Sequence, residues 1–391
     1  MRILLLSLYY TPDIGPGALR ADSIVKALNE RDKNISIDVI TSKPNRYSGL
    51  QNIEADSFNL YKNFSIKKIS LPKHKNDMLS QSYGFLFFAW NTFRITRKQN
   101  YDLVVATSSR LMTAFLGALI AKRVNAKLYL DIRDLFADTM KNILSKSPLK
   151  IVLPLIKIIE RFTFNAADKI NVVSGGFVEY IKEIEPSIEP SEYTNGLDEE
   201  FLNKKFSYIR KSKIPKILYA GNIGKGQGLA EVIPRAAEAI SDAAQFIIIG
   251  DGAQKADLEL KIKTTGLVNV KLESPVKRTE LFSKYKEADI LFLHLNNFKA
   301  FEKVLPSKIF EYAATGKPIL AGVNGFAAEF LRNNVPGVFI FEPQNLEQMI
   351  LAFEDILKMS KRYDRSAFCK RYLRKNIMKK MAKDICSLSA N

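Results

Sequence analysis

Short apolar runs alternate with longer amphipathic segments along almost the whole chain. The first half contains five runs that are typical of buried β-strands, at residues 2–10, 36–41, 102–108, 127–134 and 169–174. The second half contains six more, at residues 216–221, 246–252, 270–274, 290–295, 318–323 and 338–343. Strands separated by helical segments predict βαβ units and parallel sheets, so each half is expected to form a doubly wound α/β domain.

A polar, charged segment without hydrophobic periodicity, residues 195–216, separates the two series. We therefore expect an N-terminal domain over residues 1–200 and a C-terminal domain over residues 201–368. Residues 369–391 are expected to form a basic helical tail, and the N-terminal domain is a candidate surface for it. A chain of 391 residues is long enough for two domains with separate cores.

The charge of the chain indicates a partner. Its formal net charge is +18, and basic residues concentrate in two segments: 62–127 carries twelve Lys and Arg against two Asp, and 358–383 carries eleven against one. Such segments suit an anionic membrane surface or a nucleic acid, but no zinc spacing, RNP-like aromatic motif or heptad-linked basic helix occurs. A membrane surface is favoured by aromatic residues beside the first segment: Phe85, Phe87, Phe88 and Trp90. The alternatives are solvated basic faces and a core helix that buries these rings.

Cysteine content and the length of the apolar runs predict a cytoplasmic protein. Cys369 and Cys386 make no disulfide framework, so a reducing compartment fits. No signal peptide is expected at the N-terminus. The apolar runs at 83–93 and 151–162 are shorter than the roughly 20 residues of a membrane span.

Glycine follows three of the expected strands, where ligands bind to doubly wound sheets. The turns are 11–20, with Gly15 and Gly17, then 220–229 and 250–255. Glycine lets the backbone approach a ligand closely, because it has no Cβ. None of the three is a complete G-x-G-x-x-G, so an ordinary turn is the alternative at each.

The segment "KVLPSKIFEYAATGKPILAG" (303–322) predicts a short helix with marked ends. Ser307 is expected to be its N-cap and Gly316 to end it. Lys308 and Glu311 stand where a helix N-terminus can hold a phosphate. A well-capped connector helix explains the same residues without a ligand.

Taken in order, these features resemble glycosyltransferase family 4, whose members are retaining enzymes of the GT-B fold. The resemblance rests on the Gly15–Gly17 turn, "DIRDLFAD" (131–138), "ERFTFNAADKINVVS" (160–174), "NGLD" (195–198), "YAGNIGKGQGL" (219–229), "GDG" (250–252) and "FEKVLPSKIFEYAATGKPILAG" (301–322). The last segment is similar to the branch that builds bacterial O-antigen and capsule, including N-acetyl-L-fucosamine transferases. The resemblance implies two doubly wound Rossmann-like domains that face a central cleft.

The resemblance also implies a reaction and its partners. A sugar, with an N-acetylated deoxyhexosamine as one candidate, would pass from a nucleotide-sugar donor, with UDP expected, to a saccharide on polyprenyl diphosphate. No cofactor, metal or nucleic acid is implied, and the enzyme would work on the inner face of the plasma membrane. Two histidines and two distant cysteines give no metal cluster, and Asp-x-Asp does not occur.

By resemblance, the helix in 303–322 would bind the nucleotide part of the donor. Glu311 would accept hydrogen bonds from both ribose hydroxyls, which two carboxylate oxygens suit. Lys308 would offset the diphosphate charge. The diphosphate would be lined by three residues: Leu305, Pro306 and Ser307. The backbone at Val276 would contact the base. Gly15 and Gly17 of the first turn are also candidates for binding the nucleotide-sugar.

Other family positions differ in this chain. In the glycine loop (residues 220–229), Asn222 and Gln227 stand where basic residues are common. Asn222 and Lys225 are the candidates there for binding the nucleotide-sugar, and the phosphates would depend on Lys225, Lys308 and backbone N–H groups. Lys303 stands where the family usually has a second glutamate, with Glu302 one place earlier. Glu302 is a candidate catalytic residue, and Lys303 is a candidate for contacts with the donor sugar.

In the first domain, Arg133 replaces a histidine that is common in the family. Arg133 and Asp134, at the end of an expected strand, are candidate catalytic residues that would contact the acceptor or the sugar. Their alternative is a local Asp–Arg pair that caps the following helix. His74, in a basic loop, and His294, in an expected strand, are interpreted as structural.

Two other functional classes stay open. One is another nucleotide-sugar enzyme, such as a UDP-sugar epimerase or a dinucleotide oxidoreductase, although the fingerprint is incomplete and no suitably placed Tyr-x-x-x-Lys occurs. The other is a non-catalytic membrane-bound scaffold, which the lysine at 303 favours.

Overall fold

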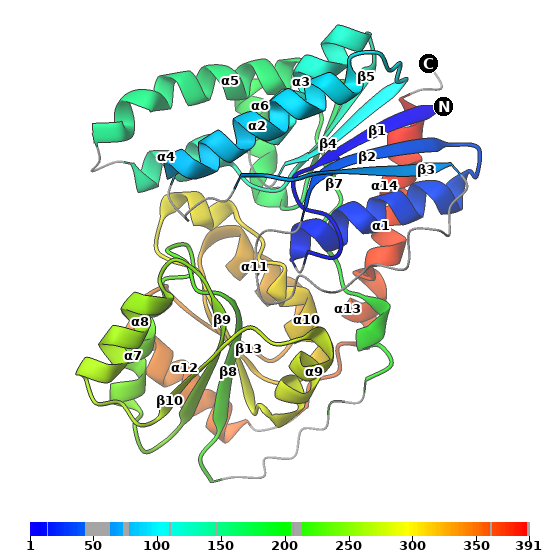
Figure 1. The fold of residues 1–391 in the computed structure, drawn as a ribbon. Coiled ribbons are helices and arrows are strands. Elements are labelled where there is room, and N and C mark those ends of the chain that lie inside the picture. The colour runs from blue at the N-terminus through cyan, green and yellow to red at the C-terminus, as the bar shows by residue number, and fades with distance from the viewer. Residues whose placement is uncertain are drawn as a thin grey trace. The chain divides into compact units, whose positions relative to one another are not determined.

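The computed structural model describes residues 1–13, 15–43, 63–72, 78–108, 111–144, 148–204, 206, 213–359 and 362–388. His74 and part of the first basic segment (Lys62, Lys73, Lys75 and Arg110) lie outside these ranges. The chain divides into two compact units, Met1–Asn195 with Arg374–Asn391, and Gly196–Leu373. Each unit contains a parallel sheet with helices, as Figure 1 shows, so the predicted α/β fold class is confirmed.

Unit 1 is built on a seven-stranded sheet with the order β3-β2-β1-β4-β5-β6-β7. Its strands are β1 (Arg2–Ser7), β2 (Ser36–Ser42), β3 (Phe64–Ile69), β4 (Leu103–Ser108), β5 (Lys127–Ile132), β6 (Lys169–Val172) and β7 (Ser191–Glu192). The central strands are almost wholly buried, as continuous apolar runs in parallel sheets require.

The helices of unit 1 cover both faces of this sheet. They are α1 (Pro16–Arg31), α2 (Met78–Thr96), α3 (Leu111–Val124), α4 (Phe136–Ile143), α5 (Leu153–Asn165), α6 (Val178–Ile184) and α14 (Arg374–Ser387), with 3₁₀ turns η3 (Pro148–Val152) and η4 (Gly175–Phe177). The chain runs from β1 to β2 in one direction and from β3 through β4 and β5 to β6 in the other. Right-handed crossovers therefore place α1 on one face and α2, α3 and α5 on the opposite face (Figure 1).

Unit 2 has a six-stranded parallel sheet with the order β10-β9-β8-β11-β12-β13. The strands are β8 (Lys216–Asn222), β9 (Gln245–Asp251), β10 (Val270–Glu273), β11 (Ile290–His294), β12 (Ile319–Gly322) and β13 (Val338–Phe341). The helices are α7 (Leu229–Ala239), α8 (Lys255–Thr264), α9 (Arg278–Glu287), α10 (Lys308–Thr315), α11 (Gly325–Asn334), α12 (Leu346–Lys358) and α13 (Ser366–Arg371), with 3₁₀ turns η5 (Glu199–Phe201) and η6 (Lys299–Lys303). All six strands expected in this half are present.

The unit boundaries fall near the expected ones but not on them. Leu197 N donates to Tyr372 O at 2.8 Å, and Leu197 forms an isolated bridge with Leu373. The Phe368 and Tyr372 rings pack with Phe310 of the same unit. Residues 369–373 therefore belong to unit 2 and not to the tail. The tail helix α14 begins at Arg374 and packs against α1 of unit 1.

Candidate functional site

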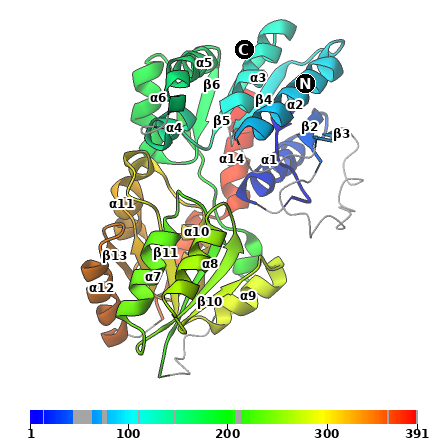
Figure 2. The same ribbon diagram turned by 60° about the vertical axis from the view of Figure 1, so that its left-hand side comes forward.

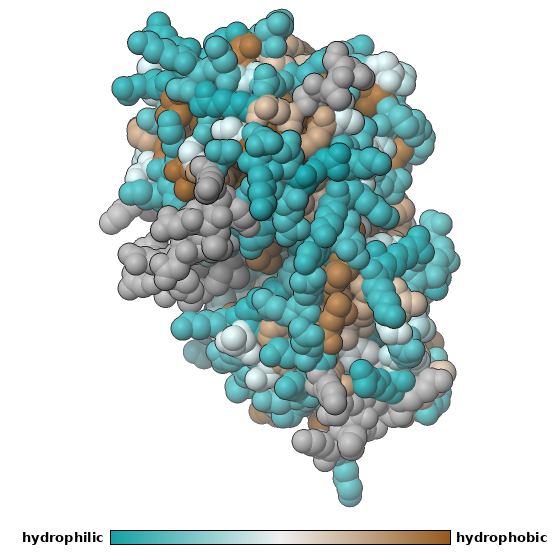
Figure 3. Space-filling model, turned by 90° about the vertical axis from the view of Figure 1, so that its right-hand side faces the viewer, coloured by the Kyte–Doolittle hydropathy of each residue, from teal (hydrophilic) through white to brown (hydrophobic). Residues whose placement is uncertain are grey.

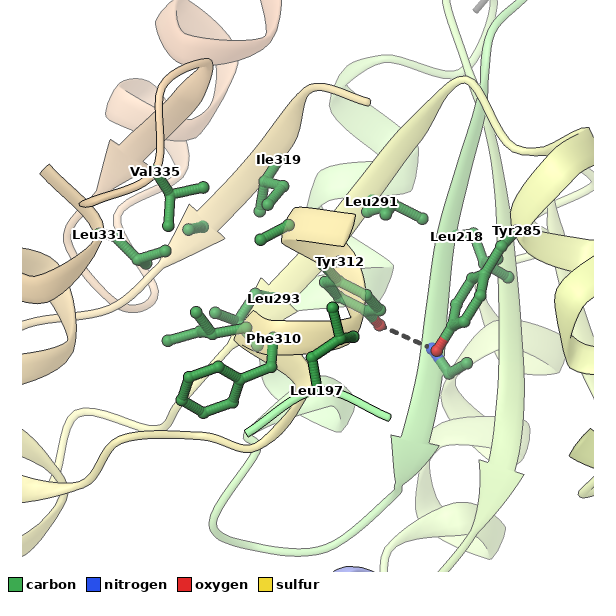
Figure 4. Packing of buried hydrophobic residues seen from close by; sticks show 14 of the residues in the cluster. Leu197, Leu218, Tyr285, Leu291, Leu293, Phe310, Tyr312, Ile319, Leu331 and Val335 are labelled. Carbon is green, nitrogen blue, oxygen red and sulfur yellow. Dashed lines mark hydrogen bonds between the residues drawn. The ribbon is translucent and has the colours of Figure 1, made fainter. Parts of the chain in front are cut away.

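Helix α10 is fixed in the core of unit 2 by one apolar face. Ile309, Phe310 and Tyr312 are fully buried, and Figure 4 shows Phe310 and Tyr312 among the leucines of the surrounding strands. The Tyr312 hydroxyl accepts a hydrogen bond from Ala220 N at 3.1 Å, which ties α10 to β8. This packing fixes the position of Glu311, whose side chain stays 17% exposed.

The ends of α10 differ in how well the sequence predicts them. Gly316 has φ +71°, the left-handed conformation expected of a helix-ending glycine. Ser307 occupies the predicted N-cap position, but its backbone is helical (φ −60°, ψ −24°) and its side chain makes no capping hydrogen bond. Ile309 N and Phe310 N bond to Pro306 O and Ser307 O, so a tight 3₁₀-like turn already includes Ser307.

Glu311 is the acceptor at the centre of a charged cluster. Its Oε2 accepts hydrogen bonds from the Tyr285 hydroxyl and from Lys308 Nζ, both at 2.8 Å, and Arg278 Nη1 lies 3.9 Å from Oε1. Burial raises the pKa of Glu311, but Lys308 and Arg278 lower it by more, so its pKa lies below the usual value. The group is therefore ionised at neutral pH. A carboxylate oxygen accepts more than one hydrogen bond, so Oε1 retains capacity for a ligand hydroxyl.

Arg278 and Tyr285 are site residues that the sequence did not reveal. Arg278 also pairs with Asp198 and with Glu200, whose Oε2 lies 3.0 Å from Arg278 Nε. Asp198 belongs to the "NGLD" segment, so Arg278 connects that segment to Glu311. The only signal in the sequence was the need of a buried carboxylate for a cation, which many Lys and Arg residues satisfy equally.

The Lys308 side chain is already paired in this structure. Its Nζ lies 2.8 Å from Glu311 Oε2 and 3.3 Å from the Tyr285 hydroxyl. The suggested role of Lys308 toward a diphosphate therefore requires this ammonium to be shared with Glu311. Leu305 is buried in the apolar core and Val276 packs against it, so only their backbone groups suit a polar ligand.

The loop between β8 and α7 is held by its own polar side chains. Gln227 Oε1 accepts hydrogen bonds from Asn222 Nδ2 at 2.8 Å and from Gly224 N at 3.2 Å. Asn296 donates from Nδ2 to Lys225 O and from its backbone N to Gly226 O, both at 2.8 Å. Asn222 and Gln227 thus shape the loop, which leaves the Lys225 side chain and backbone N–H groups as candidates for an anion.

Residues 296–303 run from Asn296, which bonds to the loop between β8 and α7, to Lys303, where the family usually has a second glutamate. Lys225 Nζ lies 5.9 Å from the centre of the Phe298 ring. Glu302 is exposed and Lys303 is half-buried on η6. The structure thus brings Lys225 and the η6 pair to neighbouring segments of unit 2.

His294 stabilises the loop between β8 and α7, in agreement with its interpretation as a structural residue. Its ring is 1% exposed, Nδ1 lies 2.6 Å from Gln227 O, and Nε2 accepts from Gln344 N at 3.3 Å. Burial lowers the pKa of His294 to about 4. The ring is therefore neutral, with the proton on Nδ1 donated to Gln227 O.

The buried neutral histidine predicts that acid destabilises unit 2. The pKa is about 4 in the folded protein and 6.5 in the unfolded chain, so the unfolded state binds more protons between these values. Stability should fall as pH drops from 6.5 to 4, by about 2–3 kcal/mol from this group. Urea unfolding followed by circular dichroism at about pH 7.5 and about pH 5 measures the loss. His294→Gln should remove most of it, and an unchanged pH dependence in this variant would contradict the assignment.

In unit 1, Arg133 and Asp134 follow β5. A Cβ on Gly17 would lie 2.3 Å from Arg133 Nη1, so the glycine lets the guanidinium lie against the start of α1. Burial lowers the pKa of Arg133 to about 10 and raises the pKa of Asp134 to about 6. Arg133 Nε is buried and has no hydrogen-bond partner among the described residues.

The alternative of a helix-capping Asp–Arg pair is not what the structure shows. Helix α4 starts after Leu135 without a side-chain capping bond, and Asp134 Oδ1 accepts from Thr139 Oγ1 at 3.4 Å. Gly15, whose backbone is extended, is the residue before α1. Unit 1 thus contains four of the predicted site residues: Gly15, Gly17, Arg133 and Asp134.

The described ranges contain neither a candidate metal site nor a candidate membrane-spanning helix. No group of three or more His, Cys, Asp or Glu there could hold a metal ion. None of the helices described combines the length and the apolar composition of a membrane-spanning segment.

Comparison with known proteins agrees with this architecture. Residues 200–372 match the family model described as glycosyl transferases group 1. The putative colanic acid biosynthesis glycosyl transferase WcaI of Escherichia coli K12 is 24% identical over 283 residues, 68% of each chain. HepE of Anabaena in complex with UDP-glucose superposes with a TM-score of 0.69 at 15% identity, over 99% of both chains.

Enzymes of another activity share the fold. A putative UDP-N-acetylglucosamine 2-epimerase from Listeria monocytogenes has a TM-score of 0.57 at 13% identity, over 99% of this chain and 96% of its own. The chain therefore has the GT-B fold, and residues 200–372 within it match the glycosyl transferases group 1 family model.

Proposed function

We propose that this protein is a retaining glycosyltransferase that transfers a sugar from a UDP-sugar to a lipid-linked saccharide in the synthesis of a surface polysaccharide. The group 1 match over residues 200–372 supports the reaction class, and similarity to WcaI supports the pathway class. The observation that carries the proposal within the structure is the ionised Glu311, held among Lys308, Arg278 and Tyr285.

In this proposal, Glu311 Oε1 and Oε2 accept hydrogen bonds from the vicinal ribose hydroxyls. Lys225, the shared Lys308 and the backbone N–H groups of Leu305, Ser307 and Lys308 stabilise the negative charge that develops on the departing diphosphate. The bond between the sugar C1 and the diphosphate oxygen breaks, and a bond between C1 and the acceptor oxygen forms on the same face. The acceptor proton passes to the departing phosphate, which leaves as nucleoside diphosphate.

The remaining candidates receive roles consistent with their positions. Glu302 and Lys303 would contact the donor sugar. Arg133 and Asp134 would contact the acceptor or the sugar, and a carboxyl group with a pKa of about 6 is suited to exchange a proton near neutral pH. The proposed working place is the cytoplasmic face of the plasma membrane, where the chain meets anionic lipid.

The second candidate is a UDP-sugar epimerase, which the Listeria structure favours. A melting-temperature screen over UDP-, GDP- and TDP-sugars identifies the donor, and an assay for nucleoside diphosphate with an acceptor separates the two reactions. Release of diphosphate with transfer supports the transferase. A bound donor that changes its sugar without a glycosylated product would support the epimerase, and the absence of any bound donor would support a scaffold.

We expect transfer to persist in excess EDTA. In the proposed reaction the charge on the diphosphate is stabilised by basic side chains and backbone N–H groups instead of a divalent ion. The measurement is the initial rate of diphosphate release with EDTA and with added Mg²⁺ or Mn²⁺. A strict requirement for either ion would refute this part of the proposal.

A further inference from the structure

A row of apolar side chains is exposed along η3 and α5 of unit 1. Ile151 is 81% exposed, Leu155 59%, Ile158 65% and Phe162 36%. Their spacing of four, three and four residues places them on one face of the helical segment. We call these four residues the α5 stripe. An aligned set of exposed, large apolar residues is unusual on a water-facing helix and indicates a binding surface.

Helix α2 exposes a second row, the α2 stripe. Tyr83 is 62% exposed, Leu86 63%, Phe87 39% and Trp90 68%. The other two aromatic residues expected at a membrane surface, Phe85 and Phe88, are only 8% and 0% exposed. That expectation is wrong for these two, which belong to the core. It stays open for Phe87 and Trp90, which point outward.

The two stripes stand in one layer of unit 1. Helix α3 contacts both α2 and α5, and the Phe115 and Phe162 rings meet edge to face with their centres 5.7 Å apart. Figures 1 and 2 show α2, α3 and α5 together on the face of the sheet opposite α1. Exposed residues of α2 and α5 therefore lie on a layer whose inner side packs on the sheet.

The exposed charges on α2, α3 and η3–α5 all have one sign. The segments 78–96, 111–124 and 148–165 contain one carboxylate, Glu160, which is 2% exposed and accepts a hydrogen bond from the Tyr180 hydroxyl at 2.6 Å. The exposed charged residues in these segments are Arg94, Lys122, Arg123, Lys150, Lys157 and Arg161. Helices α4 and α6, which both pack against α5, add charges of both signs: Asp138 and Lys141 on α4, and Glu179, Lys182 and Glu183 on α6.

This combination favours a membrane over a protein partner. Lysine is depleted in protein–protein interfaces, whereas Lys and Arg beside apolar helix faces attract anionic lipid and keep their charges in the headgroup region. Trp and Tyr at the edge of an apolar patch prefer the same region. The face drawn in Figure 3, by contrast, is mainly hydrophilic, with hydrophobic residues scattered over it.

We propose that the α2 and α5 stripes together form the surface by which unit 1 binds an anionic bilayer, with both helices lying in the interface and neither crossing it. The inference rests on the membrane partner of the proposed function and specifies the surface that meets it. Unit 1, which inserts its stripes into the bilayer interface, would then be the unit that meets a lipid-linked acceptor. Neither stripe is long enough to hold the protein alone, so binding should be reversible.

The chain contains a natural probe for this contact, because Trp90 is its only tryptophan. On addition of phosphatidylcholine vesicles that contain phosphatidylglycerol, Trp90 emission should shift to shorter wavelength and become protected from acrylamide. Pure phosphatidylcholine should give a much smaller shift. The titration midpoint gives the affinity without any label.

The decisive variant changes the α5 stripe, so that Trp90 of the α2 stripe is kept as the probe. Leu155→Glu with Ile158→Glu should weaken vesicle binding about tenfold or more, since two apolar residues are lost and two negative charges are added. The matched control is Leu260→Glu with Leu351→Glu on unit 2, where the native side chains are 60% and 61% exposed. It should bind as the unaltered chain does. Ile151→Gln, which adds no charge, should give a smaller loss in the same direction.

Each outcome is informative. Equal loss in the α5 variant and the control, or no loss in either, overturns the proposal. A Trp90 shift that depends on protein concentration without vesicles indicates a second copy of the chain on this surface and also overturns it. UDP-sugar binding, followed by melting temperature in the same proteins, should be unaffected by the α5 variant. Donor binding without vesicle binding refutes only this inference, and vesicle binding without donor binding refutes only the proposed function.

Discussion

Replacement of Asp131 by Ala is expected to lower the free energy of unfolding of unit 1 by about 3–5 kcal/mol, the largest stability effect that the structure predicts for one substitution. Arg20 and Asp131 have 0% exposed side chains, and they form a two-pronged ion pair with Nε–Oδ2 and Nη2–Oδ1 distances of 2.8 Å. Asn171 Nδ2 donates to Oδ1 at 2.7 Å. Without the carboxylate, a guanidinium stays buried with two carbonyls, of Tyr193 and Thr194, and the Met381 sulfur as its neutral acceptors.

Urea unfolding followed by Trp90 fluorescence measures this loss in the correct unit, because the single tryptophan lies in unit 1. The control is Glu189→Ala, which removes the ion pair between Glu189 and Lys182. The side chains of Glu189 and Lys182 are 79% and 36% exposed. It should change stability little, because exposed ion pairs contribute little to stability. Replacing both buried partners, as Arg20→Met with Asp131→Leu, should recover much of the loss. Similar values for Asp131→Ala and Glu189→Ala would show that the buried pair is not what stabilises this region.

The sheets could be predicted from the sequence because parallel strands bury both faces. Runs such as residues 102–108 and 290–295 are apolar without alternation, and each became a central strand. The two strands that the pattern missed lie on the β3 edge and the β7 edge of the unit 1 sheet. β3 carries Lys67 and Lys68 and is mostly half-buried, and β7 has only two residues. An edge strand buries too little surface for the hydrophobic pattern to reveal it.

Helix α2 shows why composition alone misplaced the aromatic residues. Its inner side includes Phe85, Phe88, Thr92 and Thr96, all buried, while Leu86 and Trp90 are exposed. The buried threonine hydroxyls donate to carbonyls of their own helix, Thr92 to Phe88 O and Thr96 to Thr92 O, both at 2.8 Å. Threonine inside and tryptophan outside reverse the usual hydrophobic pattern, so the pattern could not identify the buried side.

The candidate site was predictable only where its residues share one segment. Lys308 and Glu311 lie one helical turn apart, so the sequence suggested both, and the structure joins them. Tyr285 and Arg278 reach Glu311 from α9, a separate element. Asn296, which follows β11, bonds to the loop between β8 and α7, and Gln344, which follows β13, bonds to Asn296. Such contacts depend on the packing of elements, which local spacing does not encode.

Glu311→Ala is expected to weaken binding of the donor by roughly 1–3 kcal/mol, about 5- to 150-fold in affinity, as for the loss of charge-assisted hydrogen bonds. The folded state should tolerate the change, because Arg278 keeps Asp198 and Glu200 and the Lys308 side chain is 25% exposed. Lowered pKa values for Glu311 keep it ionised, so the affinity of the unaltered protein should not vary with pH near neutrality.

Titration calorimetry with the nucleotide-sugar found in the screen measures this loss, and thermal melting of the unliganded variant tests its fold. The matched control is Asp355→Ala in α12, which removes a carboxylate paired with Lys358 at the same i, i+3 spacing as the Lys308–Glu311 pair. It should leave donor affinity unchanged. Lys308→Met then separates two roles of the lysine. If Lys308 only orients Glu311, binding of the nucleoside and of its diphosphate should weaken equally, whereas a direct contact with the phosphates should weaken the diphosphate alone. Undiminished donor affinity in Glu311→Ala would remove the ribose contact and, with it, the central claim for this site.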